Sequence, residues 1–148
     1  MLIGTYDHSF DAKGRVFIPA KWRETVGELI VVTEGILGAK GVNCLFGMSQ
    51  QEWDAFSEKL ALLPLTDLAG QAVKRRLYAT AAACETDKQG RILIPQSLRE
   101  YANLAKDAML VGVGNRVEIW NPADFMRHTE LTTAEYDAAL AHLAQIGI

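Results

Sequence analysis

The feature that most constrains this chain is a nine-residue sequence that occurs twice. The chain reads DAKGRVFIP at residues 11–19 and DKQGRILIP at residues 87–95. When Gly14 is aligned with Gly90, an apolar run and then a strand-like stretch follow each copy at similar distances. Similarity over about 50 residues is the signature of a duplicated structural unit. The 148 residues therefore carry two copies of one unit, which are small enough to share a core.

Each copy has the same predicted order of elements: strand, hairpin turn, strand, short helix, two further strands and a helix. Residues 15–18 and 91–94 are short apolar runs that are partly β-branched, which is typical of strands. Pro19 and Pro95 end those strands and can begin one-turn helices. Cap residues and the spacing of apolar side chains predict three longer helices, at residues 49–63, 66–78 and 132–146.

The turn in each repeated sequence has an aspartate followed three residues later by a glycine. Asp11 and Asp87 suit the first position of a type I turn, and Gly14 and Gly90 suit the left-handed position that follows it. Turn chemistry therefore explains all four as structural turn residues. It does not explain the arginine that comes next in both copies, because lysine, threonine or serine would be tolerated there.

The repeated arginines are Arg15 and Arg91, each four residues after the aspartate of its turn. A carboxylate across the turn can accept a hydrogen bond from the guanidinium and hold it in one direction. An always-charged fork that is aimed by a rigid hairpin suits the recognition of phosphates or of a guanine edge. The same geometry would also serve as a structural ion pair, and the residues alone leave both interpretations open.

The distribution of charge is compatible with a nucleic-acid partner. The net charge of −3 by itself disfavours one. Five of the acidic residues lie beyond Arg116, in a segment with a single base, so residues 1–116 carry 14 basic and 13 acidic residues. The local placement of arginine therefore decides more than the total charge.

The sequence contains no pattern typical of an enzyme, a cofactor site or a metal site. His8, His128 and His142 have no metal-ligand spacing, and no nucleophile motif occurs. We therefore expect no catalytic activity, no cofactor and no metal. Cys44 and Cys84 lie in apolar surroundings and are predicted to be small buried hydrophobic residues. Apolar runs fall short of the about 20 residues that cross a membrane, so we expect a cytoplasmic protein without membrane contact.

The chain closely resembles the bacterial MraZ family in its paired sequences DAKGRVFIPAKWR and DKQGRILIPQSLR, and in the CLFGMSQQEW and MLVGVGNRVEIWNP that follow them. Members of that family carry two tandem SpoVT-AbrB-type DNA-binding domains. The resemblance implies a mixed α+β, mainly β fold, in which two tandem AbrB-like swapped-hairpin repeats form one pseudo-dimeric β-barrel with flanking helices. The expected domains are a first SpoVT-AbrB repeat at 1–50, a helical connector at 51–79, a second repeat at 80–124 and a C-terminal helix at 125–148.

The resemblance also implies what the protein does. It implies a sequence-specific DNA-binding regulator of transcription, a repressor at the promoter of the division and cell-wall gene cluster, that acts as a ring-shaped homo-oligomer. The implied partners are other copies of the chain and double-stranded promoter DNA with short direct repeats, and the implied location is the nucleoid in the cytoplasm. The motif that presents the DNA-reading arginine carries over onto Asp11, Lys13 and Arg15 in the first repeat, and onto Asp87, Lys88 and Arg91 in the second.

Two points in this interpretation stay open. Gln89 stands where the first copy has Lys13, so the second copy departs from the motif and is the less certain DNA contact. Arg23 and Arg99 follow the short helices and are equally compatible with structural packing and with phosphate contact. The alternative function is an oligomeric scaffold that does not read DNA, in which the arginines hold subunits together. An antitoxin is disfavoured, because the domain is duplicated and no disordered tail follows it.

Overall fold

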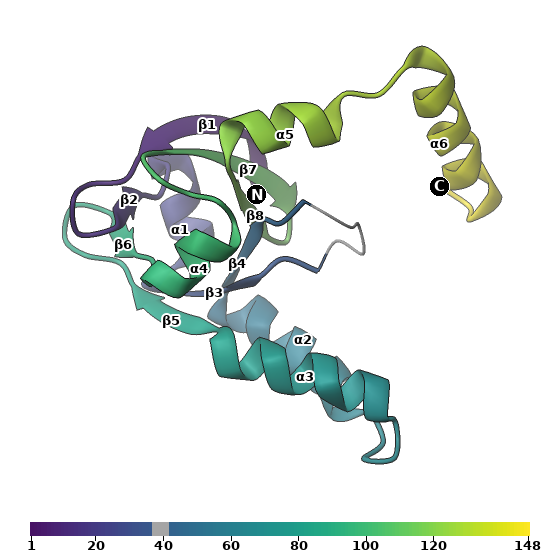
Figure 1. The fold of residues 1–148 in the computed structure, drawn as a ribbon, viewed down its shortest axis with the longest axis horizontal. Helices are drawn as coiled ribbons and strands as arrows, with labels where there is room; N and C mark the ends of the chain where they lie inside the picture. Colours follow the sequence, from purple (N-terminus) through teal and green to yellow (C-terminus); the bar gives the residue numbers. More distant parts are fainter. Residues whose placement is uncertain (37–41) are drawn as a thin grey trace.

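The computed structural model describes residues 1–36 and 42–148. Figure 1 shows a core of strands and short helices, from which two helical arms extend. The first half consists of β1 (Leu2–Ser9), β2 (Arg15–Phe17), η1 (Ala20–Trp22), α1 (Arg23–Val26), β3 (Leu29–Glu34), β4 (Leu45–Ser49), α2 (Gln50–Ala61) and α3 (Leu68–Thr80). The second half consists of β5 (Ala82–Glu85), β6 (Arg91–Leu93), α4 (Gln96–Tyr101), β7 (Asp107–Gly114), β8 (Val117–Trp120), α5 (Pro122–Thr129) and α6 (Thr133–Gln145).

The two halves correspond element by element, which confirms the duplication. The short helical turns η1 and α1 of the first half correspond to α4 of the second, and α2 and α3 correspond to α5 and α6. The three longer helices predicted from the sequence are α2, α3 and α6, and each end lies within two residues of its predicted position. Thr132 begins α6 with a complete capping box, in which its hydroxyl accepts from the amide of Glu135 and the Glu135 carboxylate accepts from the Thr132 amide.

The strand order shows that the two repeats exchange strands. Six strands form one antiparallel sheet in the order β1-β7-β8-β4-β3-β5, and β2 pairs with β6 in a second sheet. The counterparts in the two repeats are β1 and β5, β3 and β7, and β4 and β8. When each strand is replaced by its counterpart, the same sheet is obtained, read from its other edge, as an internal two-fold relation requires. The first strand of each repeat lies beside the third strand of the other: β1 pairs with β7, and β5 pairs with β3. Neither repeat can therefore complete its sheet alone.

Strand pairing within the described residues does not show the expected closed barrel. Within the described residues, the mixed α+β character and the exchanged hairpins are present, but strand pairing leaves two separate sheets, with β1 and β5 as the edges of the larger one. The two-stranded β2–β6 sheet has Val16 opposite Ile92 at its centre, and both side chains are buried. The smaller sheet therefore packs into the core through one face while its ends carry the two turns.

Both repeats supply the main core. Equivalent residues of the two copies, such as Ile18 and Ile94, are fully buried in one hydrophobic cluster. Trp22 is buried beside them, and its ring meets Tyr6 edge to face at 5.0 Å. Each such side chain contributes roughly 1.5–3 kcal/mol through the apolar area that it removes from water. Cys44 and Cys84 are both buried, as the sequence predicts.

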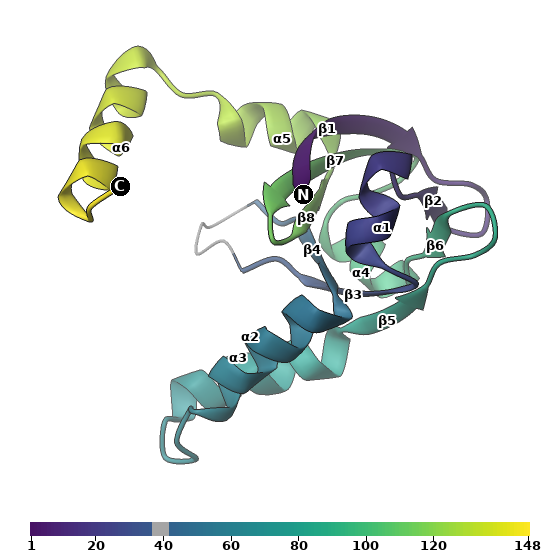
Figure 2. The same cartoon turned by 180° about the vertical axis from the view of Figure 1, so that it is seen from behind.

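The helical arms differ in how they are held. Trp53 of α2 packs against Tyr78 of α3 with ring centroids 5.3 Å apart, so these two helices support each other. Phe125 of α5 packs on Trp120 at the end of β8. Figures 1 and 2 show α6 standing away from the rest of the chain in both views. No helix in the described part of the chain combines the length and apolar character that a membrane span requires.

Candidate nucleic-acid interface

The turn between β1 and β2 is organised by the carboxylate of Asp11. One carboxylate oxygen accepts hydrogen bonds from the backbone amides of Lys13 (3.0 Å) and Arg15 (2.9 Å). The other accepts from Nε of the Arg15 side chain at 2.6 Å. The backbone closes the turn, because the Gly14 amide donates to the Asp11 carbonyl at 3.0 Å. One carboxylate thus shapes the loop and aims the arginine that leaves it.

The turn between β5 and β6 has the same construction. Asp87 accepts from the amides of Gln89 and Arg91, each at 2.9 Å, and from Nε of Arg91 at 2.9 Å. The Gly90 amide donates to the Asp87 carbonyl at 3.0 Å. The replacement of Lys13 by Gln89 therefore leaves the turn unchanged, because only the backbone of this residue takes part in the turn.

The hydrogen bonds to the two carboxylates also lower their pKa values. The pKa of Asp11 falls from 3.8 to about 2, chiefly because the backbone amide of Arg15 donates to the charged form. The pKa of Asp87 is lowered in the same way by the amide of Arg91. Both aspartates are therefore ionised throughout the neutral range, and each presents a fixed negative charge to its arginine.

Gly14 and Gly90 have φ values of +86° and +83°, in the left-handed region that favours glycine. An arginine side chain also lies against the Cα atom of each glycine. A Cβ at Gly14 would lie 2.8 Å from the guanidinium of Arg99, and a Cβ at Gly90 would overlap the guanidinium of Arg23. The structure thus places Arg23 and Arg99 against the turns, each on the turn of the other repeat.

The two turns lie at opposite ends of the short β2–β6 ribbon, and the antiparallel pairing brings Arg15 and Arg91 onto its outer face, because Val16 and Ile92 occupy the buried face. In this pairing Arg15 faces Leu93, and Phe17 faces Arg91. The Arg91 guanidinium lies over the ring of Phe17, 5.9 Å from its centroid, and Nη1 of Arg91 is 3.8 Å from the Asp11 carboxylate. The side chains of Arg15 and Arg91 keep 30% and 20% of their surface exposed. Two aimed and accessible guanidinium groups therefore share one end of the molecule.

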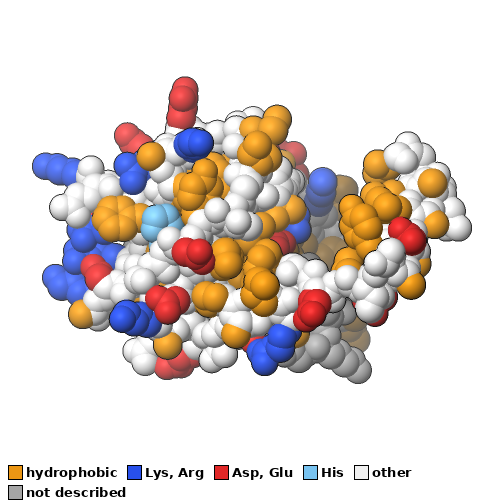
Figure 3. Space-filling view, turned by 90° about the horizontal axis from the view of Figure 1, so that it is seen from above, with side chains coloured by type: hydrophobic (Ala, Val, Ile, Leu, Met, Phe, Trp, Pro, Cys, Tyr) orange, Lys and Arg blue, Asp and Glu red, His pale blue; other side chains and the backbone are white. Residues whose placement is uncertain are grey.

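The other predicted contact residues lie on the same turns. Lys13 and Lys88 are exposed, and neither has an acidic partner within 4.0 Å among the residues that the structure describes. Figure 3 shows basic side chains gathered at the end of the molecule that carries the hairpins, at the left of the view. The predicted site residues are thus brought together, although the two copies are far apart in the sequence.

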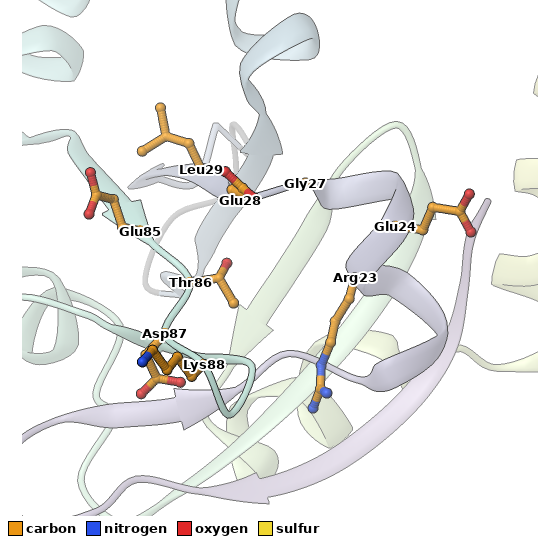
Figure 4. Close-up of a pocket in the computed structure, with 9 residues that line it drawn as sticks. All are labelled: Arg23, Glu24, Gly27, Glu28, Leu29, Glu85, Thr86, Asp87 and Lys88. Carbon is orange, nitrogen blue, oxygen red and sulfur yellow. The ribbon is translucent and has the colours of Figure 1, made fainter.

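An open cavity of about 810 Å³ separates Lys88 from Arg23 beside the second turn. Figure 4 shows its lining, with acidic side chains on several sides and Arg23 reaching from the start of α1. The carboxylates of Glu24, Glu28 and Glu85 outnumber the bases there, so this hollow repels phosphate. The turn tips therefore suit a phosphate group better than this cavity does.

Two contributions to the site escaped the sequence analysis. Phe17, on the exposed face of β2, stacks under Arg91, and an outward aromatic residue beside the motif is the signal that could have found it. The Asp11–Arg91 contact between repeats has no local sequence signal.

A second group of basic residues, at positions 74–76 of α3, lies away from the turns. Arg76 of this group pairs with Glu34 at 2.7 Å, which is a structural role.

Comparison with known families identifies the repeats. A family model described as "MraZ protein, putative antitoxin-like" matches residues 1–76 and again residues 77–144. The chain belongs to the MraZ family. Each match contains one of the swapped hairpins and helices that follow it. The first match covers α2 and ends within α3, and the second begins in the last turn of α3 and covers α5 and nearly all of α6.

Relatives of similar length share this MraZ sequence throughout. A protein of Caldicellulosiruptor saccharolyticus is 45% identical over 148 residues, which is all of both chains. One of Carboxydothermus hydrogenoformans is 47% identical over 137 residues, covering 93% of this chain and 92% of its own. One of Acetivibrio thermocellus is 45% identical over the full length of both. All three are named "Transcriptional regulator MraZ". The family resemblance seen in the repeated motif is thus confirmed.

Proposed function

We propose that this protein is a DNA-binding regulator of transcription that reads promoter DNA with its paired hairpin turns. The observation that carries the proposal is the pair Arg15 and Arg91, two partly exposed guanidinium groups that are aimed by ionised carboxylates at one end of the molecule. Guanidinium forks held in this way suit bidentate contacts with phosphate or with guanine in the major groove. The name "Transcriptional regulator MraZ" that its relatives carry supports the same function.

Each residue of the turns has a role in this proposal. Arg15 and Arg91 use Nε for their own aspartates, which leaves the terminal Nη nitrogens to meet DNA. Lys13 and Lys88 neutralise backbone phosphates as exposed point charges. Asp11 and Asp87 orient the arginines, while Gly14 and Gly90 allow the tight turns.

The target is double-stranded promoter DNA upstream of the division and cell-wall gene cluster, and the effect is repression. The family resemblance supports both the target and the effect. A protein that covers a promoter represses transcription by excluding the polymerase. A protein that recognises the cell's own promoters is expected at the nucleoid, within the cytoplasm.

Binding by one chain would be weak, so we further propose that copies assemble into a ring. One chain offers only a few phosphate or base contacts, too few for tight binding at physiological salt. A ring repeats the same hairpins around its rim and raises their effective concentration on DNA with short direct repeats. Repeats about 10 bp apart, or at a multiple of that spacing, would present the same face of the duplex to successive hairpins.

The helix α6 supports assembly, because its apolar side chains are all exposed in the part of the chain that the structure describes. Tyr136, Leu140 and Leu143 lie at helical spacing and are 55%, 46% and 38% exposed. A helix of 13 residues is marginal in water by itself. We propose that a second copy of the chain covers this face. Glutamate at both Leu140 and Leu143 should break the assembly, whereas Ala138→Glu on the opposite face should leave it intact, as measured by light scattering after size exclusion.

The deciding experiment is a salt titration of binding to DNA from immediately upstream of the protein's own gene. Arg15→Ala and Arg91→Ala are compared with wild type, and Lys59→Ala, an exposed charge on α2, serves as the matched control. We expect each arginine variant to lose roughly 5- to 150-fold in affinity and to flatten the salt dependence, while the control binds like wild type.

The scaffold alternative makes the opposite prediction. If both arginine variants assemble and bind like wild type, the Asp–Arg pairs are structural. The exposed apolar face of α6 would then be the main functional surface, with its partner another protein chain.

A further inference from the structure

Arg23 and Arg99 form the same contact in the two repeats. Nε of Arg23 donates to the carbonyl of Ile18 at 3.0 Å, and Nε of Arg99 donates to the carbonyl of Ile94 at 2.9 Å. In both copies the arginine therefore bonds back to the end of the strand that leaves its own turn. The bond uses only Nε and fixes the plane of the guanidinium.

The guanidinium then lies on the turn of the other repeat. Arg23 covers Gly90, and Arg99 covers Gly14, so closely that neither glycine has room for a Cβ. The exchange of hairpins brings this about, because it places each turn against the partner repeat. Gly14 and Gly90 thus suit the turns in two ways, through their positive φ and through the room that they leave for the guanidinium group of the other repeat.

Backbone hydrogen bonds close each contact into a loop. The Ile18 amide donates to the Gly90 carbonyl at 2.9 Å, and the Ile94 amide donates to the Gly14 carbonyl at 3.1 Å. The amide of Ile18 therefore bonds Gly90, the carbonyl of Ile18 bonds Arg23, and the guanidinium of Arg23 lies against Gly90. Three contacts between different groups define the position of the turn more tightly than any one of them.

We propose that Arg23 and Arg99 are positioning residues that act across the repeats. Arg23 of the first repeat holds the turn that aims Arg91, and Arg99 of the second repeat holds the turn that aims Arg15. This inference rests on the proposed DNA-reading function of the two turns. It favours packing over phosphate contact, the two interpretations that the sequence left open for these arginines.

The surroundings of Arg23 support a positioning role. Its neighbours around the cavity include Glu24, Glu28 and Glu85, whose charges oppose the approach of a phosphate from that side (Figure 4). Arg99 is only partly exposed and occupies the equivalent place on the first turn. A direct phosphate contact would need the guanidinium to leave the glycine that it covers.

The test combines a substitution of each positioning arginine with a substitution of the DNA-reading arginine on the turn that it contacts, and compares the promoter affinities. Arg23→Lys keeps the charge but loses Nε and the planar group. We expect it to lower promoter affinity about fivefold, to have no further effect when Arg91 is already alanine, and to keep its full effect when Arg15 is alanine. Arg99→Lys should show the reverse pattern. If Arg23→Lys binds like wild type while Arg23→Ala weakens binding equally in both backgrounds, Arg23 is a phosphate contact and the proposal is wrong.

A second measurement needs no DNA, so it separates this inference from the proposed function. Hydrogen exchange of the backbone amides of Gly90 and Arg91 should become at least about threefold faster in Arg23→Lys, while Gly14 and Arg15 exchange as in wild type. The first turn is the internal reference for opening of the whole fold. Equal acceleration at both turns, or none, would overturn the role across repeats. This measurement tests the positioning role even if the wild-type protein proves not to bind DNA.

Discussion

Nη1 of Arg91 lies 3.8 Å from the carboxylate of Asp11, so an acid of the first repeat faces an arginine of the second. The same carboxylate bonds Arg15 of its own repeat at 2.6 Å. Among the described residues, Asp87 is paired only with Arg91. The internal symmetry is therefore broken at the turn tips, and Asp11 is the acid that both arginines share.

This asymmetry predicts that Asp11→Asn harms DNA recognition more than Asp87→Asn does. Asparagine still accepts the backbone bonds of the turn, but it loses the charge that holds the guanidinium groups. We expect the ratio of promoter affinity to affinity for scrambled DNA to fall roughly tenfold for Asp11→Asn and roughly threefold for Asp87→Asn. Fluorescence anisotropy at fixed salt measures both. Equal losses would show that the contact between repeats does not contribute.

The ring of Phe17 predicts a second difference between the repeats. Arg91 stacks on Phe17, and the equivalent position in the second repeat is Leu93, which faces Arg15. Phe17→Leu should remove the stacking, worth about 0.5–1 kcal/mol, and lower affinity roughly two- to fivefold. Leu93→Phe is the matched control, since it leaves the Arg91 stacking in place and should bind at least as well as wild type. Similar losses in both variants would indicate a packing defect instead.

The turns were predictable from the sequence because their chemistry is local. Asp11, Gly14 and Arg15 interact within five residues, and each bond in the turn follows from the aspartate, the glycine and the order in which they occur. The longer helices were predictable for a similar reason, because cap residues such as Thr132 act on the next turn of backbone.

The contacts between repeats were not predictable, because they depend on how distant strands exchange. Arg23 reaches Gly90 and Arg91 reaches Asp11 only because β2 pairs with β6, and no local pattern specifies that pairing. The same limit applies to the barrel: the family resemblance implied two repeats with swapped hairpins, but the division of the strands into a six-stranded and a two-stranded sheet depends on packing. The motif indicated which residues form the candidate site, and strand exchange determines which of them touch.

The lowered pKa of Asp11 predicts how stability responds to acid. Its pKa is about 2 in the folded chain against 3.8 in the unfolded one, so the ionised carboxylate stabilises the fold above about pH 4, and this contribution is lost as the pH falls toward 2. Asp11→Asn should therefore be less stable than wild type at pH 6, with the difference shrinking below pH 4. Denaturant unfolding from pH 6 to pH 2.5 measures it. A difference that stays constant with pH would contradict this linkage.

The two buried thiols predict slow chemical labelling of the native protein. Burial raises the pKa of Cys44 to about 12 and that of Cys84 to about 11, against an ordinary value of 9.0. Because the thiolate is the reactive form, labelling at pH 8 should be roughly 100-fold slower at Cys84 and roughly 1000-fold slower at Cys44 than in the unfolded chain, even before access is considered. Absorbance after addition of an aromatic disulfide reagent gives the rates, and Cys44→Ser and Cys84→Ser assign them. Rapid labelling of one thiol in the folded protein would mean that its part of the core opens locally, and β5, an edge strand that carries Cys84, is where such opening is expected first.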